Sequence, residues 1–332
     1  MLTVSKSPLR VSFFGGGTDY PDYFKQFPGA VLGTAIDKFI YTIMLPMSGA
    51  SQTNYRITYR KVEEVDRISD IQHNVIRSVL TEYKYNDPMN IAIISDLPGN
   101  SGLGSSSSFT VGFIKLISHL QGRSITKLDL MRAAVHIEAD VLQENVGIQD
   151  QTHSAFGGLN LYRFQGNDFS IQPIRMTTDS RDALNASLCL VYTGIERSAS
   201  ATVEEQVKKT REKKVHKELT HLYDLCEHGV QVLEGNDPDR MLTELGRLLD
   251  DGWQTKRSLS SAISTPRIDE IYDTAKSLGA FGGKLCGAGG GGFMLFLAPK
   301  HAQQKMLETF GQKHFVKIAT EDSGAAIVRD FA

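Results

Sequence analysis

The chain has 332 residues, of which 41% are hydrophobic and 22% charged, and its formal net charge is −2. This length suits one large domain or two packed domains. The near-neutral charge gives no electrostatic support for binding nucleic acid or an anionic membrane, and no apolar run reaches the roughly 18 residues of a membrane span.

The cysteines and the first residues are those expected of a protein in the cytoplasm. Cys189, Cys226 and Cys286 lie far apart and fit no metal-binding spacing, which is typical of reduced thiols in the cytoplasm. The opening segment MLTVSKSPLR lacks the apolar core of a secretion signal. We therefore expect a cytoplasmic protein. The basic run VKKTREKKVHK (207–217) has acidic residues around it, which favours a solvated helix face over a docking patch.

The first half of the chain mixes strands and helices. β-Branched and aromatic residues predict strands at 9–14, 39–45, 55–60 and 90–97. Apolar residues at helical spacing predict a helix that follows four consecutive serines, with Phe113, Leu116, Ile117 and Leu120 on one face. A second helix is expected over 127–145, and then a hairpin of 157–164 and 168–176.

The pattern starts again after about residue 184. A strand at 187–193 is followed by predicted helices at 199–234, 237–251 and 266–278, and then by a strand at 292–298, a helix at 300–312 and a strand near 314–319. Strands mixed with helices in both halves predict an α+β fold. We expect an N-terminal domain over residues 1–183 and a C-terminal domain over residues 184–332.

The stretch LPGNSGLGSSSSFT, residues 97–110, joins a predicted strand to a predicted helix. It is too short for an interdomain linker, the common role of Gly/Ser tracts. A glycine-rich turn into a helix presents free backbone N–H groups and the positive end of the helix dipole, which together bind phosphate. A capped helix is the alternative, although one serine suffices for a cap. No Walker A sequence occurs in the chain.

Two further glycine clusters flank this stretch. CGAGGGGFMLF (286–296) satisfies G-x-G-x-x-G through Gly287, Gly289 and Gly292. A dinucleotide site needs a helix after that motif, whereas a strand is expected here. The glycines are therefore better explained by a close approach of two backbone segments, and the motif does not support an NAD-dependent dehydrogenase. In PLRVSFFGGGTDY (8–20), Asp19 follows three glycines in a loop. Its side chain either binds a polar ligand or only caps the turn in which it lies.

One carboxylate falls on the apolar face of the helix expected over 127–145. Glu138 shares that face with Met131, Ala134, Val135 and Leu142. A buried carboxylate is unfavourable unless it is paired or bound to metal, so a salt bridge and a metal site both remain open. Beyond the helix, GIQDQTHSAFGG (147–158) carries Asp150 and His153. Two acids after a phosphate loop suggest one on Mg²⁺ and one near an acceptor hydroxyl, with His153 as a competing base.

The three glycine clusters, in this order, resemble the motifs of the GHMP superfamily, the small-molecule kinases named for galactose, homoserine, mevalonate and phosphomevalonate. PLRVSFFGGGTDY resembles the first motif, LPGNSGLGSSSS the second and KLCGAGGGGF the third, so the likeness covers nearly the whole chain. The usual second motif ends in Ser-Ser-Ala, whereas this chain has Ser107. The resemblance implies an N-terminal domain like ribosomal protein S5 domain 2, with a left-handed β-α-β unit, and a ferredoxin-like C-terminal domain. It implies ATP and Mg²⁺ as cofactors.

The resemblance also implies roles for single residues. Asp150 would deprotonate or orient the acceptor hydroxyl as the catalytic residue, while Ser106 and Glu138 would hold Mg²⁺. The segment Lys284 to Gly292 would support the phosphate loop. The residues expected around the ATP phosphates are Pro98, Gly99, Ser101, Gly102, Leu103, Gly104, Ser105, Ser106 and Ser107. Those expected around the sugar are Arg10, Gly17, Thr18, Asp19, Tyr20, Gly289 and Gly290.

Within the superfamily, the chain most resembles kinases of D-glycero-D-manno-heptose 7-phosphate. The likeness is carried by GGGTDYPDYF, in place of Gly-Glu-His-Thr-Asp-Tyr of galactokinases, by TGIERSAS (193–200) and by GWQTKRSLSSAIS (252–264). A phosphorylated sugar needs cationic donors away from ATP, and the candidates are Arg197 with Ser198, and Lys256 or Arg257.

The expected reaction is ATP-dependent phosphorylation of the anomeric hydroxyl of that heptose phosphate, giving the 1,7-bisphosphate for nucleotide-activated heptose and surface polysaccharide synthesis. A GHMP-type kinase for fucose, galactose or unphosphorylated heptose is the alternative. An RNA-binding module with an S5-like fold is a more distant one, which the near-neutral charge disfavours. The expected partner is a small-molecule sugar phosphate, with no nucleic acid and no membrane, and the oligomeric state is left open, with a homodimer among the options.

Overall fold

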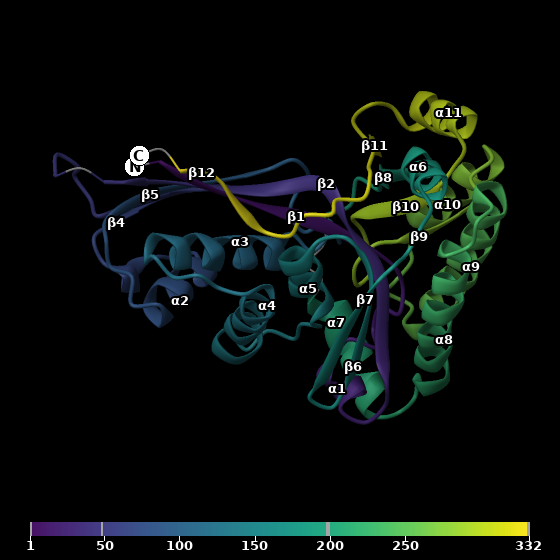
Figure 1. Ribbon diagram of the computed structural model, residues 1–332, viewed down its shortest axis with the longest axis horizontal. Coiled ribbons are helices and arrows are strands. Elements are labelled where there is room, and N and C mark those ends of the chain that lie inside the picture. The colour runs from purple at the N-terminus through teal and green to yellow at the C-terminus, as the bar shows by residue number, and fades with distance from the viewer. Residues whose placement is uncertain (1, 48, 197–199, 331–332) are drawn as a thin grey trace.

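The computed structural model describes residues 2–47, 49–196 and 200–330, which form two sheets with helices packed on them (Figure 1). The larger sheet has eight strands, and its main path runs β12-β1-β2-β5-β3-β4. Its strands are β1 (Thr3–Phe14), β2 (Gly29–Pro46), β3 (Tyr55–Thr58), β4 (Val62–Val65), β5 (Met89–Ser95), β6 (Leu159–Gln165), β7 (Asp168–Pro173) and β12 (Ala326–Asp330).

The long strand β2 organises this sheet. Its 18 residues do not alternate regularly between buried and exposed side chains, as those of a half-exposed strand do, because most of them are buried. One part of β2 pairs with β5 and another part with β6, while β1 runs antiparallel along most of it, from Leu32 to Met44. The expected hairpin is confirmed, since β6 and β7 pair antiparallel.

Helices α2 (Asn74–Glu82), α3 (Ser105–Leu120) and α4 (Lys127–Val135) lie on one face of this sheet (Figure 1). Helix α3 is central, because it contacts β1, β2, α4 and α5 (Gln149–Phe156). The short helix α1 (Pro21–Phe24) follows the first glycine cluster.

The helix expected over 127–145 is not one continuous α-helix. Thr126 caps α4, accepting a hydrogen bond from the Asp129 N–H at 3.1 Å. From His136 to Val141 the chain then widens into a π-helical turn, and the helix ends before residue 145. Turns of this kind often occur at functional sites, and this one carries Glu138.

The smaller sheet has the antiparallel order β11-β8-β10-β9. Its strands are β8 (Leu188–Tyr192), β9 (Gly282–Leu285), β10 (Phe293–Leu297) and β11 (Phe315–Lys317), and the helices of this half are α6 (Thr178–Ser187), α7 (Ser200–Arg211), α8 (His216–Leu233), α9 (Pro238–Leu259), α10 (Pro266–Ser277) and α11 (Lys300–Phe310). With a helical crossover before β9 and α11 before β11, the order is β-α-β-β-α-β, the ferredoxin-like arrangement. The α+β prediction is confirmed.

The predicted end of one helix differs from the structure. Helix α9 continues eight residues beyond the expected end at 251, through Gly252, because Trp253 and Leu259 are buried on it and tertiary packing overrides a weak propensity. The division at residue 184 remains a prediction, although it falls within α6. The last strand, β12, does not stay with the smaller sheet and pairs antiparallel with β1 in the larger one.

A common core joins the two sheets. Buried Phe14 and Leu32 of the first sheet contact α8 so closely that a side chain on Gly229 would collide with both. Within the described ranges, no helix combines the length and the low polarity needed to cross a membrane.

Candidate active site

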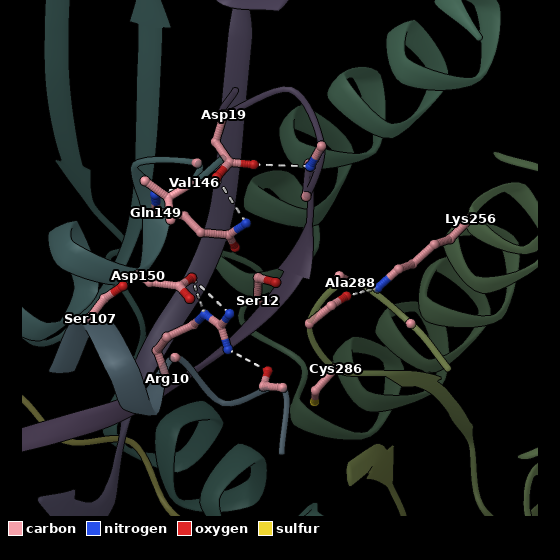
Figure 2. A pocket seen from close by; sticks show the side chains of 18 of the residues that line it. Arg10, Ser12, Asp19, Ser107, Val146, Gln149, Asp150, Lys256, Cys286 and Ala288 are labelled. Carbon is pink, nitrogen blue, oxygen red and sulfur yellow. Dashed lines mark hydrogen bonds and ion pairs between the residues drawn. The ribbon is translucent and has the colours of Figure 1, made fainter. Parts of the chain in front are cut away.

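A cavity of about 250 Å³ lies where the three glycine clusters meet (Figure 2). Its walls come from the end of β1 and the loop after it, the loop that leads into α3, the start of α5, helix α9, and the turn between β9 and β10. Segments from both halves of the chain therefore form one cavity.

The second glycine cluster forms the turn into α3. Gly102 and Gly104 have φ values of +80° and +74°, which other residues rarely adopt. Gly104 is the N-cap of α3 and offers no side-chain oxygen to the first-turn N–H groups. Those amides and the positive end of the helix dipole therefore lie at the cavity, an arrangement that suits an anion.

The nine residues expected around the ATP phosphates fall into two groups. The residues that line the cavity are Gly102, Gly104, Ser105, Ser106 and Ser107. Pro98, Gly99, Ser101 and Leu103 do not line it and instead shape the loop. The carbonyl oxygen of Leu103 accepts from the Arg10 N–H at 3.1 Å, and that of Ser101 accepts from the Phe293 N–H at 3.0 Å.

The third glycine cluster supports the second from behind. A Cβ on Gly287 would lie 2.6 Å from the Cα of Gly102, and one on Gly292 would lie 2.3 Å from the Ser101 carbonyl oxygen. The predicted close approach of backbones is confirmed, and a strand follows the motif, so it does not form a dinucleotide site. Gly289 lines the cavity, whereas Gly290 does not, and its N–H donates to Ile263.

Arg10 connects Asp150 to the phosphate loop. Its Nε and Nη2 lie 2.8 and 2.7 Å from Asp150 Oδ1, and its Nη1 donates to the Gly102 carbonyl oxygen at 2.6 Å. Arg10 was expected beside the sugar corner at Asp19, but its hydrogen bonds place it between the expected catalytic aspartate and the loop (Figure 2). The second oxygen of Asp150 faces the start of α3, since a Cβ on Gly104 would lie 3.2 Å from Oδ2.

Glu138 lies behind the serines and is only 1% exposed. Its carboxylate accepts from Ser107 Oγ at 2.8 Å, from Thr110 Oγ1 at 2.6 Å and from Gln151 Nε2. Burial raises its pKa to about 7. No lysine or arginine in the part of the chain that the structure describes pairs with it, so the salt-bridge alternative has no partner.

This arrangement fits Mg²⁺, which prefers carboxylate and hydroxyl oxygens and takes few protein ligands when phosphates complete its shell. A cation would also compensate the unpaired buried charge of Glu138. Ser107 is the hydroxyl in contact with Glu138, while Ser106, the serine expected on the metal, is exposed and lines the cavity. Ser107 and Thr110 lie three residues apart on α3, a spacing that signals a shared face in the sequence.

Asp19 is fully buried at the opposite side of the cavity. It accepts from the Gly17 N–H at 3.0 Å and from the Gln149 backbone and side-chain amides, and burial raises its pKa. Gly17 and Tyr20, which are expected at the sugar site, line the cavity. Thr18 does not, because its hydroxyl bonds the backbone of Gly15 and Ala30 inside the loop.

Two lysines enter the cavity from the C-terminal half. Lys284 donates to the carbonyl oxygens of Ser12 and Phe13 at 2.8 and 3.0 Å, and Lys256 donates to those of Leu285, at 3.1 Å, and Gly287. Burial lowers the pKa of Lys284 to about 8 and that of Lys256 to about 7. Neither ammonium has a carboxylate partner among the ion pairs of the described residues, so both favour an anionic ligand.

The other candidates for the sugar's phosphate are less well placed. Arg197 and Ser198 lie outside the described residues. Arg257 forms an ion pair with Asp269 at 3.1 Å and does not line the cavity.

His153 is not a base in this site. It is fully buried outside the cavity lining, its Nδ1 lies 2.7 Å from the Gln149 carbonyl oxygen, and burial lowers its pKa to about 3. This burial was not predicted, because residue 153 was expected in a polar loop and lies instead in helix α5.

Known families match both halves of the chain. Residues 71–158 match the GHMP kinases N terminal domain, and residues 238–317 match the GHMP kinases C terminal domain. The chain is 28% identical over 303 residues to a D-glycero-alpha-D-manno-heptose 7-phosphate kinase of Campylobacter jejuni, with 88% of each chain covered. It is 26% identical over 329 residues to a galactokinase of Thermotoga neapolitana, with 91% of each covered.

Solved structures share the fold at lower identity. A D-glycero-D-manno-heptose 1-phosphate kinase from Bacteroides thetaiotaomicron superposes with a TM-score of 0.78 at 21% identity, over 100% of both chains. The galactokinase of Lactococcus lactis, complexed with galactose, superposes with a TM-score of 0.72 at 17% identity, covering 98% of this chain and 95% of that one. These likenesses establish the arrangement of both halves.

Proposed function

The chain belongs to the GHMP kinase family, and on that premise we propose that it transfers the γ-phosphate of ATP to the anomeric hydroxyl of D-glycero-D-manno-heptose 7-phosphate. The products are the heptose 1,7-bisphosphate and ADP. One observation carries this proposal: a Cβ on Gly104, the N-cap of α3, would lie 3.2 Å from Asp150 Oδ2, so a carboxylate and a helix N-terminus lie together in one cavity.

The proposed chemistry depends on position more than on covalent catalysis. The ATP phosphates would bind the amides from Gly102 to Ser107. Glu138 with Ser107 or Ser106 would hold Mg²⁺, which would neutralise phosphate charge. The anomeric oxygen forms a bond to the γ-phosphorus as the bond to the ADP oxygen breaks, and the hydroxyl proton passes to Asp150. Arg10 occupies Oδ1 of Asp150, which leaves Oδ2 for this proton.

The acceptor then lies between Asp19 and Asp150. Asp19 accepts hydrogen bonds from sugar hydroxyls, and Tyr20 and Gly17 border the ring. The 7-phosphate is assigned to Lys256, with Arg197 and Ser198 as further candidates. The lysine's lowered pKa supports this, because an ammonium without a carboxylate partner gains most from a bound dianion.

The heptose assignment is supported by the Campylobacter relative. Galactokinases match at almost the same identity, so a GHMP-type kinase for another sugar is the second candidate. A coupled assay of ADP release separates the two, using heptose with and without its 7-phosphate, galactose and fucose. The proposal predicts a kcat/KM that is highest for the 7-phosphate. A preference for galactose or fucose would select the second candidate, and no turnover with any of the sugars would contradict both.

A further inference from the structure

Gln149 lies between the two acidic side chains of the cavity. It is the first residue of α5, directly precedes Asp150, and lines the cavity together with Asp19 (Figure 2). Its backbone N–H and its side-chain Nε2 both donate to Asp19 Oδ2, at 3.3 and 3.0 Å. The expected sugar contact at Asp19 is therefore shared with a second polar side chain.

These bonds fix the orientation of the Gln149 amide. A carboxylate that receives hydrogen bonds must face the nitrogen, so the oxygen Oε1 points away from Asp19. Oε1 is buried and receives no hydrogen bond from any residue that the structure describes. In native proteins a buried acceptor without a donor is uncommon and calls for an explanation.

The surroundings of this amide belong to the acceptor side of the cavity. The Gln149 Nε2 and the Ser12 Oγ each lie 3.9 Å from the point where a Cβ on Gly16 would stand, and all three residues line the cavity. A residue larger than glycine at position 16 would therefore occupy space next to the amide.

Asp19 alone has little remaining capacity for hydroxyl groups. A carboxylate offers about four acceptor positions, and three are taken by the Gly17 N–H and the two Gln149 donors. A sugar that presents two neighbouring hydroxyls needs a second acceptor beside Asp19. Oε1 of Gln149 provides one.

We propose that Gln149 is a specificity-determining residue whose Oε1 accepts the hydrogen of a second sugar hydroxyl, next to the hydroxyl that Asp19 binds. This inference rests on the proposed function, since it requires a polyhydroxylated acceptor. The Gln149 amide then has two roles: its nitrogen positions Asp19, and its oxygen binds a sugar hydroxyl.

The test uses Gln149→Met, which keeps the length of the side chain and removes both polar atoms. Wild type and variant are compared with D-glycero-D-manno-heptose 7-phosphate and its monodeoxy analogues at each ring hydroxyl. We expect kcat/KM for the parent sugar to fall about 10-fold to 100-fold in the variant. For the analogue that lacks the hydroxyl bound by Oε1, wild type should lose about this factor and the variant should lose nothing further. The analogue that lacks the hydroxyl bound by Asp19 also couples to the substitution, because Nε2 positions Asp19, whereas the remaining deoxy positions act independently of it.

Two measurements keep the outcomes distinct. The variant must retain the wild-type KM for ATP and thermal unfolding temperature, and Gln304→Met, an exposed glutamine on α11, serves as the matched control. An equal loss with every analogue would overturn the assignment of Gln149 while leaving the kinase assignment intact. A variant that loses ATP binding or stability would overturn it too, because Gln149 would then act on the fold. No turnover by wild type with any sugar would instead refute the proposed function, and the inference with it.

Discussion

Gly287 and Gly102 meet backbone to backbone, so that a Cβ on Gly287 would lie 2.6 Å from the Cα of Gly102. This contact joins the third glycine cluster to the phosphate loop. Arg10 fixes the same loop from the other side through the Gly102 carbonyl oxygen. The loop is therefore held from the C-terminal half as well as from β1, and its amides are preorganised for a ligand.

Substituting Gly287 should impair nucleotide binding more than stability. Gly287→Ala forces the two loops apart, and we expect KM for ATP to rise about tenfold or more, a factor that corresponds to about 1.4 kcal/mol. Gly122→Ala is the matched control, because Gly122 has nearly the same φ, +68° against +67°, with nothing within 4 Å of the added Cβ. Equal KM values for the two variants would show that only backbone strain matters.

Asp150→Asn should retain ATP binding and lose turnover. The amide keeps the size of the side chain but cannot take the hydroxyl proton, so kcat should fall about 10²-fold to 10⁴-fold. Steady-state kinetics with ATP and the heptose phosphate measure this, and Asp273→Asn, at an exposed position on α10, is the control. Near-normal turnover would remove Asp150 from the mechanism.

Glu138→Gln tests the magnesium site. Ser107 and Thr110 donate to different oxygens of Glu138, so the amide keeps an acceptor oxygen for only one of them. It also removes the charge, so the half-saturating Mg²⁺ concentration should rise at least about 10-fold. Activity is titrated with Mg²⁺ at fixed ATP, with the exposed Glu308→Gln on α11 as control. An unchanged titration would limit Glu138 to a hydrogen-bonding role in the fold.

The pH dependence of acceptor binding tests Lys256. Burial lowers its pKa to about 7, and only the protonated ammonium attracts a phosphate. Affinity for the heptose 7-phosphate should therefore weaken as the pH rises through 7, although the phosphate itself is dianionic above its second pKa of about 6. In Lys256→Met this step disappears, whereas it persists in the exposed control Lys305→Met. Calorimetric titrations from pH 6 to 9 that show the same slope in both variants would place the sugar's phosphate elsewhere.

Local patterns predicted the parts of this molecule that depend on neighbouring residues. The strand-glycine-helix order predicted the turn into α3 that lines the cavity, and a carboxylate at an apolar helical position predicted the buried Glu138. Nothing local marks β12 as a partner of β1, because a pairing across more than 300 residues depends on the whole fold. The partners of Lys256 and the burial of His153 were missed for the same reason, since both depend on segments that meet only in three dimensions.

The most direct measurement is a crystal structure with a nonhydrolysable ATP analogue and Mg²⁺. The proposed arrangement predicts the triphosphate within hydrogen-bonding distance of the amides from Gly102 to Ser107, with the metal beside Glu138 and the γ-phosphate facing Asp150. A nucleotide bound elsewhere, with the turn into α3 free of phosphate, would contradict it.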